Sequence, residues 1–186
     1  RALPNMRVVV PSDAKSTREL TKWAAQTKGP VYLRLSRDVY PDLYGEDAKF
    51  EVGRGAVVRD GADVTVIACG IMVHKALEAA QLLEAKGVSV RVVDMYSIKP
   101  IDAELIVKCA AETGAIVTAE EHNIIGGLGS AVSEVLAHAG AGVPTEFVGV
   151  RDTFTESGKY AVLLKEFGLD AESVAGTVEK AVSRKK

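Results

Sequence analysis

The segment from Thr118 to Val132, TAEEHNIIGGLGSAV, places groups able to carry protons directly before a glycine-rich run. Glu120, Glu121 and His122 are residue types that serve as general acids and bases. Glycines between a strand and a helix can leave backbone N–H groups free to hold a phosphate. The segment is therefore a candidate for acid–base chemistry or phosphate binding, and equally for a tight turn with charged neighbours.

The spacing of residues in this chain can be compared with two known phosphate-binding motifs. The dinucleotide fingerprint needs a third glycine three positions after Gly129, where this chain has Val132. A P-loop ending at Ser157-Gly158-Lys159 would need Ser or Thr at position 160 and glycine at position 153, where Tyr160 and Thr153 stand. Neither fingerprint is complete, so a turn and a ligand or interface role remain equally open for the glycines, which are Gly126, Gly127 and Gly129. As a turn, these glycines would allow close packing and a positive φ, which we expect at Gly127.

The paired carboxylates do not form a dyad on an extended chain, because neighbouring side chains of a strand point to opposite faces. We expect one of Glu120 and Glu121 to have a buried polar partner and the other to face solvent. His122 is interpreted as a hydrogen-bonding or surface residue. No metal-ligand spacing links it to His74 and His138.

Two arginines in VYLRLSRD form the second candidate site. Arg34 falls within an expected strand, and Arg37 follows its carboxyl end. A guanidinium in this place can bind a phosphate or carboxylate through two parallel hydrogen bonds. A salt bridge to Asp38, or a solvated strand end, explains the spacing equally well.

Composition excludes some partners. The chain has 186 residues, 47% of them hydrophobic, and a formal net charge of −2, which argues against a nucleic-acid or anionic-membrane partner. No apolar run reaches the roughly 20 residues that span a bilayer, and no signal peptide opens the chain. Cys69 and Cys109 lie in apolar segments without CxxC spacing, so we expect buried thiols and a cytoplasmic protein.

Apolar periodicity predicts strands that alternate with helices. The expected strands are 6–10, 31–35, 56–58, 64–68, 88–95, 115–119 and 145–150. The expected helices are one that Ser12 or Asp13 caps and that ends near 26, 71–86, one that begins after Asp102, 128–138, 160–167 and 172–183, which Asp170 caps. Asp60-Gly61 is predicted to turn a hairpin between strands 56–58 and 64–68. This pattern indicates an α/β fold, a three-layer sandwich with a mainly parallel, partly mixed sheet.

A looser stretch with proline, glycine and charges marks a domain boundary near Gly45. Residues 1–45 are predicted to be a fragment of a second α/β domain, and residues 46–186 a complete domain. Because Arg1 leads almost at once into a strand-like run, we expect the chain to be cut from something larger.

Six motifs occur together in one order: RALPNMRVVVPSDA, GPVYLRLSR, VTVIACG, VVDMYSIKPID, VTAEEHNIIGGLGSAV and DTFTESG. In this combination the chain resembles transketolase, most closely the separate C-terminal section of a split transketolase. The resemblance covers essentially the whole chain. It implies that residues 1–45 are the tail of a pyrimidine-binding domain and residues 46–186 a transketolase C-terminal domain.

The resemblance also implies an activity. A complete transketolase transfers a two-carbon ketol unit between sugar phosphates, with thiamine diphosphate and Mg²⁺ bound between domains of opposing subunits. The residues that hold both groups lie outside this chain, so no catalytic, cofactor-binding or metal-binding residue is expected here, and the fragment is expected to be inactive alone. Its expected partners are an N-terminal section, a second copy in a homodimer, and sugar phosphates.

Individual residues take roles from the resemblance. Arg37 matches the family arginine that binds the substrate phosphate, and Arg34 matches a neighbouring arginine of less certain role. The loop residues named above would serve docking or dimer contacts, as a turn rather than a catalytic centre. The alternatives are a deoxyxylulose-phosphate synthase, a 2-oxoacid dehydrogenase beta subunit, and a non-catalytic dimerisation or regulatory module. Ser36, in place of a proline before Arg37, favours transketolase over the synthase.

Overall fold

A five-stranded sheet forms the centre of the larger part of the chain in the computed structural model, which describes residues 1–185. The strand order is β3-β5-β4-β7-β8, in which β3 is antiparallel to β5 and the other pairs are parallel. The strands are β3 (Ala56–Arg59), β4 (Val64–Ala68), β5 (Val90–Asp94), β7 (Ile116–Asn123) and β8 (Thr145–Val150). The predicted mainly parallel, partly mixed sheet is confirmed.

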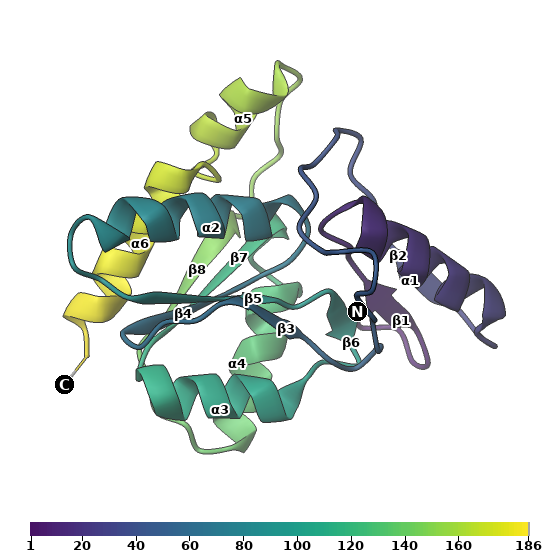
Figure 1. The fold of residues 1–186 in the computed structure, drawn as a ribbon, viewed down its shortest axis with the longest axis horizontal. Helices are drawn as coiled ribbons and strands as arrows, with labels where there is room; N and C mark the ends of the chain where they lie inside the picture. Colours follow the sequence, from purple (N-terminus) through teal and green to yellow (C-terminus); the bar gives the residue numbers. More distant parts are fainter. Residues whose placement is uncertain (186) are drawn as a thin grey trace.

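Helices cover both faces of this sheet (Figure 1). One face carries α2 (Ile71–Glu84) and α6 (Ala171–Ser183), and the other carries α3 (Ala103–Thr113) and α4 (Leu128–His138). The short α5 (Tyr160–Glu166) precedes α6. Because both faces are covered, β4 is buried along its whole length. The expected three-layer sandwich is therefore present.

Aspartates begin three of the helices, as their sequence positions predict. The side chains of Asp13, Asp102 and Asp170 each accept a hydrogen bond from the backbone N–H three residues later. Each bond satisfies a donor that the first turn of a helix leaves unpaired. The starts of α1 (Ala14–Gln26), α3 and α6 follow from this local chemistry.

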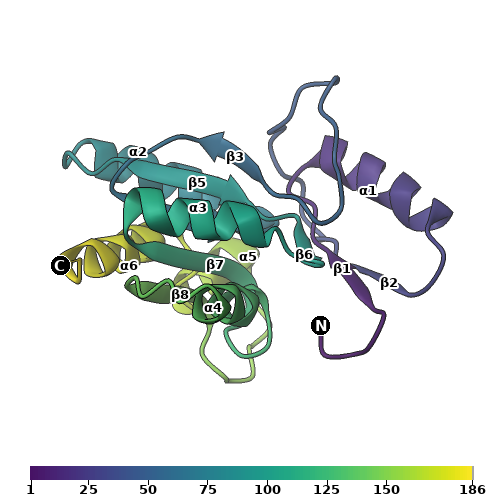
Figure 2. The same ribbon diagram turned by 90° about the horizontal axis from the view of Figure 1, so that it is seen from below.

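A second, smaller sheet lies beside the sandwich (Figure 2). Its order is β2-β1-β6, where β1 is Arg7–Val9, β2 is Val31–Leu33 and β6 is Ser97–Lys99. Val9, Leu20 of α1 and Tyr96 form its core. The expected fragment of a second α/β domain is present. The sequence did not predict β6, which pairs antiparallel with β1 and so joins the two parts of the chain.

The predicted hairpin between β3 and β4 is wrong. β5 lies between these two strands, and β3 pairs with β5. The turn at Asp60-Gly61 instead carries the chain over the start of β5, where Asp63 N–H bonds Ser89 O at 2.8 Å and Arg91 pairs with Asp60. A Cβ at Gly61 would collide with the backbone of Val90, so this crossing needs glycine.

Strand β7 is longer than predicted. It runs to Asn123 rather than Ala119, with an irregular register between these residues, so Glu120, Glu121 and His122 lie in a strand and not in a loop. Their polar character had suggested a loop. β2 is shorter than predicted and ends at Leu33, which places Arg34 one residue beyond it.

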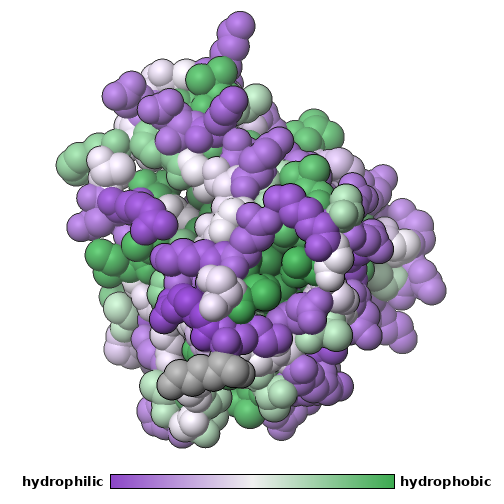
Figure 3. All heavy atoms as spheres, turned by 90° about the vertical axis from the view of Figure 1, so that its left-hand side faces the viewer, coloured by the Kyte–Doolittle hydropathy of each residue, from purple (hydrophilic) through white to green (hydrophobic). Residues whose placement is uncertain are grey.

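The polarity of the surface and the burial of the two thiols agree with what the composition predicts. Figure 3 shows hydrophilic side chains around smaller hydrophobic areas on the face that carries the end of α6. Within residues 1–185, every helix is too short or too polar to cross a membrane. Cys69 and Cys109 are free and buried, as predicted. Burial raises the pKa of Cys69 to about 12, so its thiol stays protonated and is a poor nucleophile.

Candidate functional site

The carboxyl ends of strands from both sheets face each other at the junction between the two parts of the chain. Arg34 follows β2, Gly70 follows β4, and Glu121 lies near the end of β7. Together with Ser36 and Tyr40, these residues line a cavity of about 70 Å³. Carboxyl ends of parallel strands are where open α/β sheets place ligands, so one of the two sequence-predicted arginines, Arg34, meets the predicted carboxylate Glu121 at the expected edge, while Arg37 does not line this cavity.

Glu120 fills the backbone cradle that the glycine-rich segment offers. Its side chain is 2% exposed and accepts hydrogen bonds at 2.8 Å from the backbone N–H groups of Leu128 and Gly129, at the start of α4. A negative charge is favourable at a helix N-terminus. Because the chain's own carboxylate takes these donors, a phosphate cannot use them. The phosphate interpretation of this segment is excluded.

The glycines are needed for different reasons than expected. Gly126 has a φ of +81°, whereas Gly127 has a φ of −92°, so the expected positive φ at Gly127 is wrong. A side chain at Gly127 would instead collide with the carboxylate of Glu120, and one at Gly129 would collide with Phe147. The small size of these two glycines lets α4 approach β7 closely.

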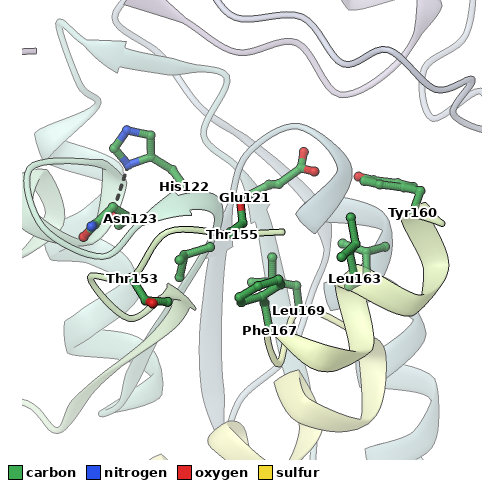
Figure 4. A pocket seen from close by; sticks show the side chains of 11 residues that line it. Glu121, His122, Asn123, Thr153, Thr155, Tyr160, Leu163, Phe167 and Leu169 are labelled. Atoms are coloured by element: carbon green, nitrogen blue, oxygen red, sulfur yellow. Dashed lines mark hydrogen bonds between the residues drawn. The ribbon is translucent and has the colours of Figure 1, made fainter. Parts of the chain in front are cut away.

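Glu121 and His122 both line one pocket but make different contacts. Glu121 is half-buried and lines a pocket beside α5 (Figure 4). The Nδ1 atom of His122 lies 2.7 Å from Asn123 O and 3.7 Å from Oε2 of Glu120. The prediction that one glutamate has a buried polar partner is confirmed for Glu120, while Glu121 faces a pocket rather than open solvent.

The two arginines differ in their surroundings. Arg34 points into the junction, where its Nη2 lies 3.7 Å from Sγ of the buried Cys69. Arg37 is exposed, and within residues 1–185 its guanidinium forms no ion pair with Asp38. Its five donors are therefore available to an anion from outside. The phosphate-binding role of both arginines stays a prediction.

Sequence reasoning missed Asp94, which is fully buried at the end of β5. Its Oδ2 accepts hydrogen bonds from the hydroxyl groups of Ser12 and, at 2.8 Å, Tyr44, while Oδ1 has no partner in the described residues. Burial raises the pKa of Asp94 to about 7; the two hydrogen bonds lower it, and the nearby Asp13 raises it. An aspartate that ends the apolar strand VRVVD was the available signal.

Comparison with known proteins identifies the family. The model of the transketolase C-terminal domain matches residues 53–174, and that of the transketolase pyrimidine-binding domain matches residues 1–42. The chain belongs to the transketolase family. A putative transketolase C-terminal section from Methanocaldococcus jannaschii is 42% identical over 99% of this chain and 58% of its own length.

Two further relatives extend the comparison. A solved split-gene transketolase, described as an inactive beta4 tetramer, is 54% identical with a TM-score of 0.96, over 100% of this chain and 61% of that one. A 1-deoxy-D-xylulose-5-phosphate synthase from Heliobacterium modesticaldum is 40% identical over 94% of this chain and 27% of its own length. The chain thus spans about three-fifths of its first transketolase relatives.

The transketolase family implies a thiamine diphosphate cofactor, and the described residues do not fit that group. The N–H groups best placed for a diphosphate are occupied by Glu120. In residues 1–185, no three His, Cys, Asp or Glu side chains are placed to hold a metal ion. No chemical step on this cofactor can be derived from the residues of this chain.

Proposed function

We propose that the chain is the C-terminal part of a transketolase that transfers a two-carbon ketol unit between sugar phosphates. One observation carries the proposal: a single continuous chain matches the end of the pyrimidine-binding domain and then the C-terminal domain, in the extent of a separate C-terminal section. The proposed boundary lies near Gly45, between residues 1–45 and 46–186.

In this proposal the chain supplies a phosphate contact. Arg37 is exposed in the segment that follows β2, where a charge-assisted hydrogen bond to a sugar phosphate can form. Arg34, inside the junction, is the second proposed phosphate-binding residue. Glu120 and the glycines hold α4 close to β7. Together with Glu121 and His122 they shape the surface that meets the rest of the enzyme.

Assembly with an N-terminal section is the second part of the proposal. That section would hold thiamine diphosphate and Mg²⁺, and the complete enzyme would be a cytoplasmic homodimer. The related solved structure is described as an inactive beta4 tetramer, which supports a chain that is silent alone. Titration calorimetry tests this: the chain alone should bind thiamine diphosphate with Mg²⁺ no better than about millimolar. Micromolar binding would overturn it.

A 1-deoxy-D-xylulose-5-phosphate synthase is the second candidate, because one such enzyme is 40% identical to this chain. Ser36 precedes Arg37 where the synthase motif has a proline, which favours transketolase. The 2-oxoacid dehydrogenase beta subunit and the purely structural module have no specific observation in their favour. Products formed with pyruvate as donor, rather than a ketose phosphate, would select the synthase.

A further inference from the structure

A pocket of about 400 Å³ lies between the end of β7, the segment 151–159 and α5 (Figure 4). Its size is within the range of small-molecule sites, roughly 300–1,000 Å³. Arg37 does not line it, so it is separate from the proposed phosphate contact. The function proposed above makes no use of this pocket.

The floor of the pocket is apolar. It is lined by Leu163 of α5, by Phe167 just after α5, and by the buried Leu164 and Leu169. An aromatic ring and three leucines offer an apolar body both contact area and a π-face. A ligand without an apolar portion would leave this surface uncovered.

The polar groups converge at one end. In Figure 4 the hydroxyl of Tyr160 points toward the carboxylate of Glu121. The Tyr160 hydroxyl is buried and makes no hydrogen bond of good geometry within the described residues, although the side chains of Glu121 and Tyr40 lie near enough to act on it. Burial raises the pKa of Tyr160, and the charge of Glu121 raises it further, so the phenol stays neutral. A buried polar atom without a partner carries a free-energy cost that a ligand can remove.

The charge at this end is negative. Among the residues that line the pocket, Glu121 carries a full charge, and within residues 1–185 it has no ion-pair partner. Arg34 lines the small cavity on the other side of Glu121 without pairing with it. His122 is directed to Asn123 O (Figure 4). With a carboxylate and without lysine or arginine in its lining, the pocket repels phosphates and carboxylates and attracts cations.

We propose that this pocket binds a small organic cation, an amine with an apolar body, whose nitrogen lies between Glu121 and Tyr160. The ammonium group donates to the carboxylate and to the phenol oxygen, and so gives Tyr160 a hydrogen bond of good geometry, which it does not make within the described residues. The apolar body lies against Leu163 and Phe167. The site would make the C-terminal domain a receptor for a ligand that differs in charge from the sugar phosphates.

The test uses the complete chain and two matched probes, 2-phenylethylamine and 3-phenylpropionate, which differ in the charge of the head group. Methyl resonances of Leu163 and Leu164 report binding. We expect saturable shifts with the amine at a Kd on the order of millimolar, and no saturable shifts with the carboxylate. Equal responses to both probes, or no saturable response to the amine, would overturn the proposal.

Variants locate the contact. Glu121→Gln should weaken amine binding roughly tenfold or more, because a charge-assisted bond is lost. Glu156→Gln is the matched control. Glu156 is an exposed carboxylate in the segment 151–159 that does not line the pocket, so this variant should leave Kd unchanged. If Glu121→Gln does not fold, Tyr160→Phe replaces it and should weaken binding severalfold. Unchanged binding in the folded variant means that the amine binds elsewhere, which rejects the site.

Discussion

Glu120 and Leu128 are joined by a hydrogen bond of 2.8 Å from the backbone N–H of Leu128 to Oε2 of Glu120. This bond, with its neighbour to Gly129, turns a glycine-rich segment that resembles a phosphate site into an internally satisfied turn. The carboxylate lies where an anion from outside would lie in a phosphate-binding protein. The bond therefore favours a structural role over a chemical one for the segment from Thr118 to Val132.

Glu120→Gln should lower the free energy of unfolding by roughly 1.5–3 kcal/mol, because a buried charge-assisted acceptor of two N–H groups becomes a neutral amide. Glu121→Gln is the matched control, since Glu121 is half-buried and makes no such bonds, and should change stability by less than about 0.5 kcal/mol. Urea denaturation of both variants gives the comparison. Equal effects in the two would contradict the assignment.

Asp94 should make stability depend on pH in the opposite sense to an ordinary aspartate. Its pKa is raised to about 7 in the folded chain, so the folded state binds the proton more tightly than the unfolded state. The stability associated with the neutral carboxyl is complete below about pH 4 and is lost as the pH rises to about 7, at up to about 1.4 kcal/mol per pH unit.

Asp94→Asn isolates this contribution, because the amide keeps an oxygen for Ser12 and Tyr44 but does not titrate. The stability of this variant relative to the original chain should improve by on the order of 3 kcal/mol between about pH 4 and about pH 8. The comparison cancels the pH dependence contributed by titratable groups near Asp94 that both chains share. These are Asp13, Tyr44 and His74, whose ring lies against Ser12 O. A difference that does not change with pH would show that Asp94 is ionised when buried.

Arg37→Ala in the assembled enzyme should reduce kcat/KM for phosphorylated sugars about tenfold to a hundredfold, from the loss of one charge-assisted phosphate contact. Non-phosphorylated acceptors should respond little. Arg18→Ala removes another exposed arginine, paired with Glu46, and is the control for a change in overall charge. Steady-state kinetics with both acceptor types decide; equal losses for both would indicate a structural role for Arg37.

Local chemistry explains what the sequence predicted correctly. Apolar periodicity determined the strands and helices, and the capping aspartates Asp13, Asp102 and Asp170 marked helix starts. Both signals depend on neighbours within a few residues, which a linear reading contains. The α/β class and the three layers follow from the alternation of these elements.

Non-local contacts explain what was missed. The Asp60-Gly61 turn is compatible with a hairpin, and only the position of β5 shows that the chain crosses over it. The bond between Ser12 and Asp94 joins residues 82 positions apart. The pocket beside α5 is formed by the side chains of β7, β8 and α5 together. Pairing and cavity formation depend on the three-dimensional arrangement, which the pattern of residue types leaves undetermined.

Ketol transfer by the chain with and without its N-terminal section tests the central claim most directly. A ketose phosphate donor and an aldose phosphate acceptor are supplied with thiamine diphosphate and Mg²⁺, and product is followed over time. We predict no turnover above buffer with the chain alone, and turnover when the N-terminal section is added in equal amount. Turnover by the chain alone would contradict this account. So would a lack of turnover in a complex that forms and binds the cofactor.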